Sequence, residues 1–535
     1  MLGRRQPQRS LFEATAWPHR VASDSFYGRM ASVSDVLFRD DDLASMYTLD
    51  NGRPSLPPSL LCGVLLLQFY DNVGDEEAVE RVRFDLRWKV ALALPLDFAG
   101  FDPTSLVVFR KRLLQHGKER YAFERFLSVA REAGFLPEKL RLLVDSSPQK
   151  GAGAVQDTYT LLRKGVRKLL RAMGFAVPEK RRGLAANLAP YLENDQKARI
   201  DWADPDERRG ELARLVADAD AVLALAQEQA DDPEVRTTGW LLTKILGDDV
   251  VEGDDGQPQI GEGVARDRMM SWTDPTMRHG RKSASGRWNG AKIQVAEEPE
   301  TELITAVDVV DASAGDGKAL LALIDDVETS TQARVEQVTA DTAYGEAENR
   351  VGCAARGIDL MAPVGSGGDP AVAKDAFTLG EEGESLTCPT GQTTTDWREV
   401  KDPQGRAVTQ FRFARSVCAA CPLFERCVRS KTTGRTVTLH YHEGILRAAR
   451  ERQATPAFRE QYRQRAMIER KIAEVMGQGL RQARYVGRKK HRLQAAWTVA
   501  VVNLKRLLTL AQHDPMGFRE ALAGRSPRAI AGMVS

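Results

Sequence analysis

The first part of the chain repeats apolar residues at helical spacing, with polar turn signals between the repeats. Residues 60–70 form one apolar run, residues 71–75 interrupt it, and residues 78–86 line one face of a second helix. Asp102-Pro-Thr104 then opens a third helical pattern. These patterns predict an all-helical domain over residues 1–138. Its arginines suit DNA docking in helix-turn-helix fashion, and a packing or dimerisation module is the alternative interpretation.

Strand patterns begin after residue 138 and bring two aspartates into comparable settings. The apolar run 140–144 ends at Asp145, and the run 335–340 ends at Asp341. Residues 292–296 and 303–310 flank the polar segment Glu298-Pro-Glu-Thr301, which predicts a β-hairpin. The sequence therefore predicts an α/β fold in which each aspartate follows a strand.

Two long segments interrupt the strand patterns. Helical stripes over residues 151–262 predict a helical insertion. Short alternating runs around four cysteines over residues 353–455 predict a small β-rich insertion. The core would then comprise residues 139–150, 263–352 and 456–512.

The C-terminal part is predicted to be helical and then loose. Thr455-Pro456 supplies an N-cap and a first-turn proline, and Gly477 and Gly479 predict an end near Met476. A second apolar helix over residues 495–510 should pack behind the core. The tail, residues 513–535, is expected to be loose.

The overall charge does not indicate a nucleic-acid partner, because 76 Lys and Arg stand against 74 Asp and Glu in 535 residues. The local distribution of charge does indicate such a partner, because residues 447–506 hold sixteen Lys and Arg and only four Asp and Glu. This block either binds phosphates or forms an ordinary solvated face. Its members include Arg481, Arg484, Arg488, Lys489 and Lys490.

The apolar runs are too short for a membrane span, which needs about 18 consecutive apolar residues. The N-terminus also lacks the apolar stretch of a signal peptide. We therefore expect a cytoplasmic, nucleoid-associated protein that does not contact a membrane.

Four of the six cysteines are clustered, as Cys388 and the group Cys418-x2-Cys421-x5-Cys427. Such spacing predicts a tetrahedral thiolate site for structural Zn²⁺, although Cys388 stands alone and His440 or His442 could replace one ligand. Reduced thiols without metal and a redox pair are the alternatives. Cys62 and Cys353 are expected in the core.

Asp145, Asp341 and Glu469 are candidate ligands for a pair of Mg²⁺ ions. Carboxylate oxygens suit Mg²⁺, and two ions about 4 Å apart can stabilise both the attacking and the leaving oxygen of a phosphodiester. Tyr462, Arg465 and Glu469 advance by three and four residues, which places them on one face of a helix. A surface Arg–Glu pair is the alternative interpretation of that spacing.

The settings of the three acids resemble the signature regions of bacterial insertion-sequence DDE transposases. Asp145 lies in Val-Asp-Ser-Ser-Pro, Asp341 in Thr-Ala-Asp-Thr-Ala-Tyr-Gly, and Glu469 in Tyr-x2-Arg-x3-Glu. Four further regions look like the same family: Gly-Ala-Gly-Ala-Val-Gln-Asp157, Asp274-Pro with Gly-Arg-Lys282, Trp288-Asn-Gly-Ala-Lys292, and the helical region from Gly52 to about Phe126. One position departs from the pattern, because Met476 stands where the family often has lysine. Arg481 and Arg484 are the candidates to take over the role of that lysine.

The resemblance implies an RNase H-like mixed sheet core and a DNA transposase. Two Mg²⁺ held by Asp145, Asp341 and Glu469 would support strand cleavage at transposon ends and 3′-OH strand transfer. Double-stranded DNA would contact Tyr462, Arg465 and Lys292 as well as the basic block, and a homodimer would hold two ends. The alternatives are an inactive transposase-derived DNA-binding or regulatory protein and a stand-alone metal-dependent nuclease.

Overall fold

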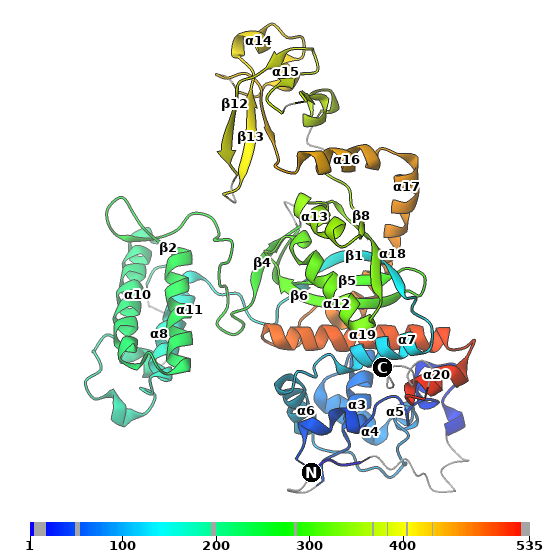
Figure 1. Cartoon of the computed structure of the whole chain (residues 1–535). Coiled ribbons are helices and arrows are strands. Elements are labelled where there is room, and N and C mark those ends of the chain that lie inside the picture. The colour runs from blue at the N-terminus through cyan, green and yellow to red at the C-terminus, as the bar shows by residue number, and fades with distance from the viewer. Residues whose placement is uncertain are drawn as a thin grey trace.

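The structure is a computed structural model, in which a mixed sheet lies between groups of helices (Figure 1). It describes residues 1–4, 18–48, 54–193, 200–282, 286–365, 369–381, 383–402, 405–430 and 432–525. Gly52, where the family-like N-terminal region begins, and residues 526–535 of the predicted tail lie outside the described residues. The predicted α/β class is confirmed.

The central sheet combines parallel and antiparallel strands. Its members are β1 (Lys139–Lys150), β4 (Arg278–Arg281), β5 (Arg287–Glu298), β6 (Leu303–Asp311), β7 (Arg334–Ala340) and β8 (Asp359–Met361). The order is β4-β5-β1-β7-β8, with β6 also paired to β5. β1, β7 and β8 run parallel, whereas β5 is antiparallel to its partners. The predicted hairpin is therefore confirmed as β5 and β6.

Two predicted limits of the sheet are wrong. β1 does not end at Asp145 but continues to Lys150, because β5 still pairs with residues 146–150 after β7 has ended. β8 extends the sheet beside β7, although the β-rich insertion was predicted to begin at residue 353. A strand of three residues is too short to show an alternating pattern.

Helices cover both faces of the sheet. α12 (Leu320–Thr331) packs on β6 and β7, α13 (Ala347–Ala355) leads into β8, and α18 (Ala466–Val475) packs on β1 and β5. α19 (Arg488–Leu510) lies between β6 and the N-terminal helices, which explains why its residues are buried on almost every side. The predicted helix behind the core is thus confirmed.

The N-terminal helices share their core with the sheet. They comprise α2 (Phe26–Ala31), α3 (Pro58–Asp71), α4 (Asp75–Phe84), α5 (Leu86–Ala91), α6 (Thr104–Gln115) and α7 (Tyr121–Glu132), with single 3-10 turns at Pro18–Arg20 and Asp41–Met46. Phe69 of α3 stacks on Trp497 of α19 with ring centroids 6.5 Å apart. One continuous buried cluster therefore joins these helices to the sheet.

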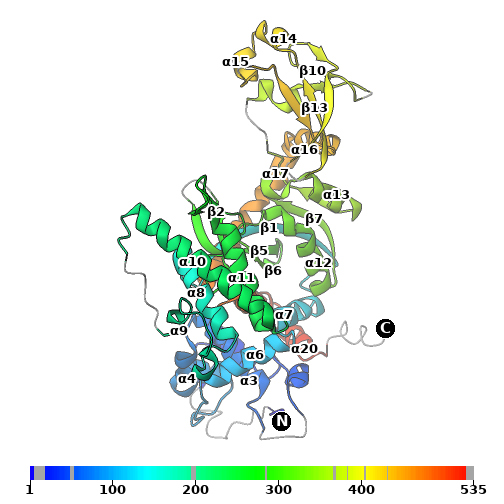
Figure 2. The ribbon, with the colours of Figure 1, turned by 90° about the vertical axis from the view of Figure 1, so that its left-hand side faces the viewer.

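The segment between β1 and β4 forms a separate helical layer beside the sheet (Figures 1 and 2). It contains α8 (Thr158–Ala172), α9 (Pro190–Glu193), α10 (Pro205–Ala226), α11 (Pro233–Asp249), 3-10 turns at Pro178–Arg181 and Gln227–Gln229, and the hairpin β2 (Val250–Glu252) and β3 (Pro258–Ile260). Leu161, Leu215 and Leu242 belong to a hydrophobic cluster of its own. The Gln156 N–H donates to the Met270 carbonyl (2.9 Å), so the two connections to the core lie side by side.

A small β-rich part stands above the sheet in Figure 1. Its described residues form two three-stranded sheets. These are β9 (Thr378–Leu379) to β11 (Thr393–Thr394) through β10 (Leu386–Thr387), and β12 (Trp397–Lys401) to β14 (Thr436–Leu439) through β13 (Ala407–Arg412). Short helices α14 (Arg415–Ala419) and α15 (Phe424–Cys427) follow β13. The end of the predicted insertion is helical instead, because α16 spans Glu443–Gln453.

The helix predicted from Pro456 is present with one irregular turn. α17 (Pro456–Tyr462) passes through a 3-10 turn at Arg463–Arg465 into α18, which ends at Val475. The Thr455 hydroxyl accepts the Phe458 N–H, as an N-cap does. A π-turn at Met476–Leu480 follows, and Gly479 has φ 96°, so glycine ends the helix as predicted.

The prediction of a loose tail is wrong for residues 515–522. These residues form α20 (Pro515–Leu522), with Phe518 and Leu522 buried. The Arg125 guanidinium donates to the Leu522 carbonyl (2.6 Å), which fixes the helix against the N-terminal domain. Over the described residues, no helix combines the length and apolar character needed to cross a membrane.

Candidate active site

Asp145 and Asp341 lie side by side on adjacent parallel strands. The pairing of β1 with β7 ends at Val144 and Ala340. Asp145 directly follows Val144, and Asp341 directly follows Ala340. Asp341 then caps the turn Thr342–Tyr344 by accepting the Ala343 N–H (2.9 Å). The sequence prediction that the two acids lie close together therefore agrees with the sheet register.

Glu469 reaches the same place through Arg465. The Arg465 guanidinium donates from Nη2 to Asp145 Oδ2 (2.9 Å) and from Nη1 to Glu469 Oε1 (2.9 Å). Asp145 is 14% exposed, whereas Glu469 is 60% exposed. The Arg465–Glu469 pair, which was the alternative interpretation of the helical spacing, is thus present. Arg465 also binds Asp145 of β1, so the pair belongs to a larger group of charges.

The acids influence one another and the residues around them. Burial raises the pKa of Asp145, and the negative charge of Asp341 raises it further, while Arg465 and Lys282 lower it. Burial also raises the pKa of the Tyr462 phenol. The negative charges of the three acids raise this pKa further. The Tyr462 ring stacks on Phe458 with centroids 5.5 Å apart. These residues thus form one electrostatically coupled site.

The carboxylates of Asp145, Asp341 and Glu469 are the type of ligand that suits a hard divalent cation. Among the described residues, no three His, Cys, Asp or Glu side chains are placed to bind a metal ion. Arg465 lies between Asp145 and Glu469 and supplies the positive charge that a cation would provide. Glu469, which is 60% exposed, would be the most accessible of the three carboxylates to a metal ion or to DNA.

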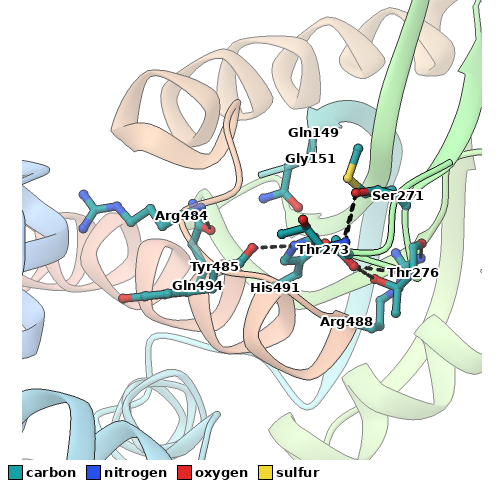
Figure 3. A network of polar contacts seen from close by, with 12 residues as sticks. Gln149, Gly151, Ser271, Thr273, Thr276, Arg484, Tyr485, Arg488, His491 and Gln494 are labelled. Carbon is teal, nitrogen blue, oxygen red and sulfur yellow. Dashed lines mark hydrogen bonds and ion pairs between the residues drawn. The ribbon is translucent and has the colours of Figure 1, made fainter. Parts of the chain in front are cut away.

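Three predicted DNA contacts turn inward instead. The Arg484 guanidinium donates to the carbonyl of Val73 (3.0 Å) and to Asn72, and lies over the Phe69 ring. Arg488 donates to the carbonyls of Val310 (2.6 Å) and Thr276 (3.1 Å) and pairs with Asp311. Figure 3 shows Arg484 pointing away from the other labelled residues and Arg488 near Thr276.

The third of these residues is Lys292, which is buried on β5. Its ammonium group donates to the Ala314 carbonyl (2.7 Å) and pairs with Asp316 (2.6 Å). Because these interactions use the charges of Lys292, Arg484 and Arg488 within the protein, we no longer assign the three residues to DNA.

Figure 3 shows a network of polar contacts that connects β1 with the start of α19 and the segment before it. His491 of α19 lies 2.9 Å from the Tyr485 carbonyl and 3.4 Å from buried Asp274. Gln149 of β1 donates to the Leu480 carbonyl (3.1 Å), and Gln494 donates to the Gln482 carbonyl (2.9 Å). The network thereby ties β1 to the start of α19.

Arg481, Lys489 and Lys490 remain exposed and are still candidates for DNA contact. Sequence analysis missed a fourth candidate, Lys282, which is exposed and close enough to lower the pKa of Asp145. Its place in the family-like segment Gly-Arg-Lys282 was the available signal. Met476, in contrast, is buried in the main hydrophobic core and cannot replace a phosphate-binding lysine.

The four clustered cysteines come together around one cavity of about 30 Å³, which Cys388, Cys418, Cys421 and Cys427 all line. Burial raises the pKa of the Cys427 thiol, and the other three cysteines act in the same direction. His440 and His442 do not line this cavity. Cys62 and Cys353 are buried in the core, as predicted.

Comparison with family models identifies two segments. Residues 16–112 match a transposase domain of the DUF772 type, and residues 387–508 match a transposase DDE domain. These two segments are therefore similar to transposase domains. The matched DDE segment includes Tyr462, Arg465 and Glu469, whereas Asp145 and Asp341 lie outside it. Searches of curated proteins and of solved structures found no match to this chain.

Proposed function

We propose that this protein is a DNA transposase that cuts DNA at the ends of a mobile element and joins the freed 3′-OH to target DNA. The observation that carries the proposal is the meeting of Asp145 and Asp341 on parallel strands, with Arg465 linking Asp145 to Glu469. We further propose that the core is RNase H-like. The order β6-β5-β1-β7-β8, with three parallel strands and an antiparallel hairpin, supports this assignment.

Asp145, Asp341 and Glu469 would hold two Mg²⁺ ions. When bound, such a pair activates water or a 3′-OH and neutralises charge on the phosphodiester. The raised pKa of Asp145 supports this proposal, because a buried carboxylate beside a second one needs a counter-charge. Arg465 supplies part of that counter-charge.

The remaining residues would position the DNA. Arg465 contacts Asp145 and Glu469 through one Nη atom each, and its remaining Nη hydrogens would suit a phosphate oxygen. Tyr462 and Lys282 lie beside the same acids and would contact the backbone on either side. The protein's contribution is thus placement and charge, and no covalent nucleophile is required. Two DNA ends held together would require a homodimer.

The test is end cleavage and strand transfer on DNA that carries the sequences flanking the gene. Asp145→Asn, Asp341→Asn and Glu469→Gln should each abolish both steps while DNA binding persists. Glu460→Gln is the matched control, since Glu460 is an exposed residue of α17 paired only with Arg463 in the described part. Activity of Glu460→Gln should equal that of the unaltered protein.

The outcomes separate the alternatives. DNA binding without cleavage by the unaltered protein would favour a non-catalytic regulator. Cleavage without joining would favour a stand-alone nuclease. Full activity in Asp341→Asn would refute the proposed ligand set.

A further inference from the structure

The β-rich part has little hydrophobic core to stabilise it. In its described residues, the buried cluster holds seven side chains: Phe377, Leu386, Phe411, Phe413, Cys418, Val437 and Leu439. Segments of this size usually need a disulfide or a metal ion in addition to their apolar core. All six described cysteines are free thiols, so disulfides do not supply that stabilisation.

The cysteines sit in turns whose backbone faces their sulfur atoms. Cys388 begins a tight turn in which Gly391 N–H donates to the Cys388 carbonyl (2.9 Å) and Gly391 has φ 82°. The Arg435 N–H donates to Cys418 Sγ (3.4 Å). Outer hydrogen bonds of this kind orient side chains that ligate a metal ion.

The second half of the cluster comes from α14 and α15. The Cys421 N–H donates to the Cys418 carbonyl (3.0 Å), so these two cysteines share one turn. Cys427 ends α15, and its N–H donates to the Leu423 carbonyl (2.9 Å). Separate turns thus place four cysteines around one cavity, and four cysteines are a common ligand set for structural Zn²⁺.

A hydroxyl group now lies between two of the sulfurs. Thr390 Oγ1 is 3.2 Å from Cys388 Sγ and 3.5 Å from Cys421 Sγ. The contact brings two sulfur atoms from separate turns to the same hydroxyl group.

We propose that Cys388, Cys418, Cys421 and Cys427 bind one structural Zn²⁺ ion. Four thiolates in tetrahedral arrangement favour Zn²⁺ over Mg²⁺, which prefers oxygen ligands. The ion would join β10, α14 and α15 and supply the stability that the small core lacks. This site is independent of the Asp145 site.

The test is the metal content of the full chain, purified without chelators and measured by plasma mass spectrometry. We expect about one zinc per chain, as for a closed four-cysteine site. Cys421→Ser and Cys427→Ser should lose most of it. Cys353→Ala is the matched control, because Cys353 lies in the sheet core, and it should retain full zinc. Asp145→Asn should also retain zinc, which separates this proposal from the proposed catalysis.

A second measurement does not depend on variants that fold. The unaltered protein is titrated with a mercurial reagent while a colorimetric indicator reports released zinc. Release in step with modification of four thiols supports the site. Less than a tenth of a zinc per chain in the unaltered protein would overturn it. Iron in place of zinc, or a mass showing disulfides among the four cysteines, would overturn it as well.

Discussion

Replacing Glu297 with glutamine should stabilise the protein, and more so at alkaline pH. Glu297 lies on β5 opposite Leu143, is 1% exposed, and has a buried Oε2 without a hydrogen-bond partner in the described structure. Burial raises its pKa from 4.5 to about 7, although nearby Lys471 lowers it. Lys471 itself bonds to Glu474 (3.0 Å), so it compensates Glu297 only in part.

The magnitude follows from the pKa difference between the folded and unfolded states. A folded pKa above the unfolded value means that the folded state holds the proton more tightly. Stability is therefore greatest below about pH 4.5 and is lost as the pH rises to about 7. A difference of about 2.5 pKa units corresponds to about 3 kcal/mol, of which about 2.5 kcal/mol falls between pH 5 and pH 8. Glutamine, which is neutral at every pH, removes this loss.

Equilibrium urea unfolding at pH 5 and pH 8, followed by tryptophan fluorescence, measures the effect. The gain in the free energy of unfolding of Glu297→Gln over the unaltered protein should be about 2.5 kcal/mol larger at pH 8 than at pH 5. Glu399→Gln, at an exposed position of β12, is the control and should change neither value. An equal gain at both pH values would refute the argument from burial.

Three further predictions concern the site and the C-terminus. Arg465→Ala should raise the affinity for Mn²⁺ several-fold, because the Arg465 guanidinium no longer competes with the cation for Asp145. Titration calorimetry measures this affinity, and an unchanged value would contradict the prediction. Lys282→Ala should lower the slope of log binding constant against log salt by about 0.9 in a DNA anisotropy assay, and an unchanged slope would exclude Lys282 from the interface. Phe518→Ala should cost about 3–5 kcal/mol in urea unfolding, since Phe518 is 2% exposed; a cost below about 1 kcal/mol would mean that α20 contributes little.

Local pattern predicted the acids better than it predicted the basic residues. Asp145 and Asp341 follow apolar runs, and adjacent parallel strands bring such positions together whatever the rest of the chain does. The surroundings of Arg484 depend on residues 72 and 73, more than four hundred positions away, so no local signal could show that its charge is used internally. The link from Arg465 to Asp145 has the same origin.

Short or tertiary-dependent elements also escaped prediction. β8 has three residues and is defined by its pairing with β7 rather than by its own sequence. α20 is a helix of eight residues that Arg125 and the N-terminal core stabilise, so its segment alone resembled a loose tail. The RNase H-like assignment came from family resemblance and stays a proposal.

The meeting of Gln156 and Met270 makes the helical layer a removable module. Trp272 N–H also donates to Gln156 Oε1 (3.0 Å), so the segment that enters the helical layer and the segment that leaves it lie side by side. Joining the two sides with a few residues would leave a shorter loop to close, and loop-closure entropy changes only slowly with length. A foreign domain could be inserted between the same two connecting segments without moving β1. Natural variation in the size of this layer, and engineered exchange of it, should therefore leave the carboxylates of the core in place.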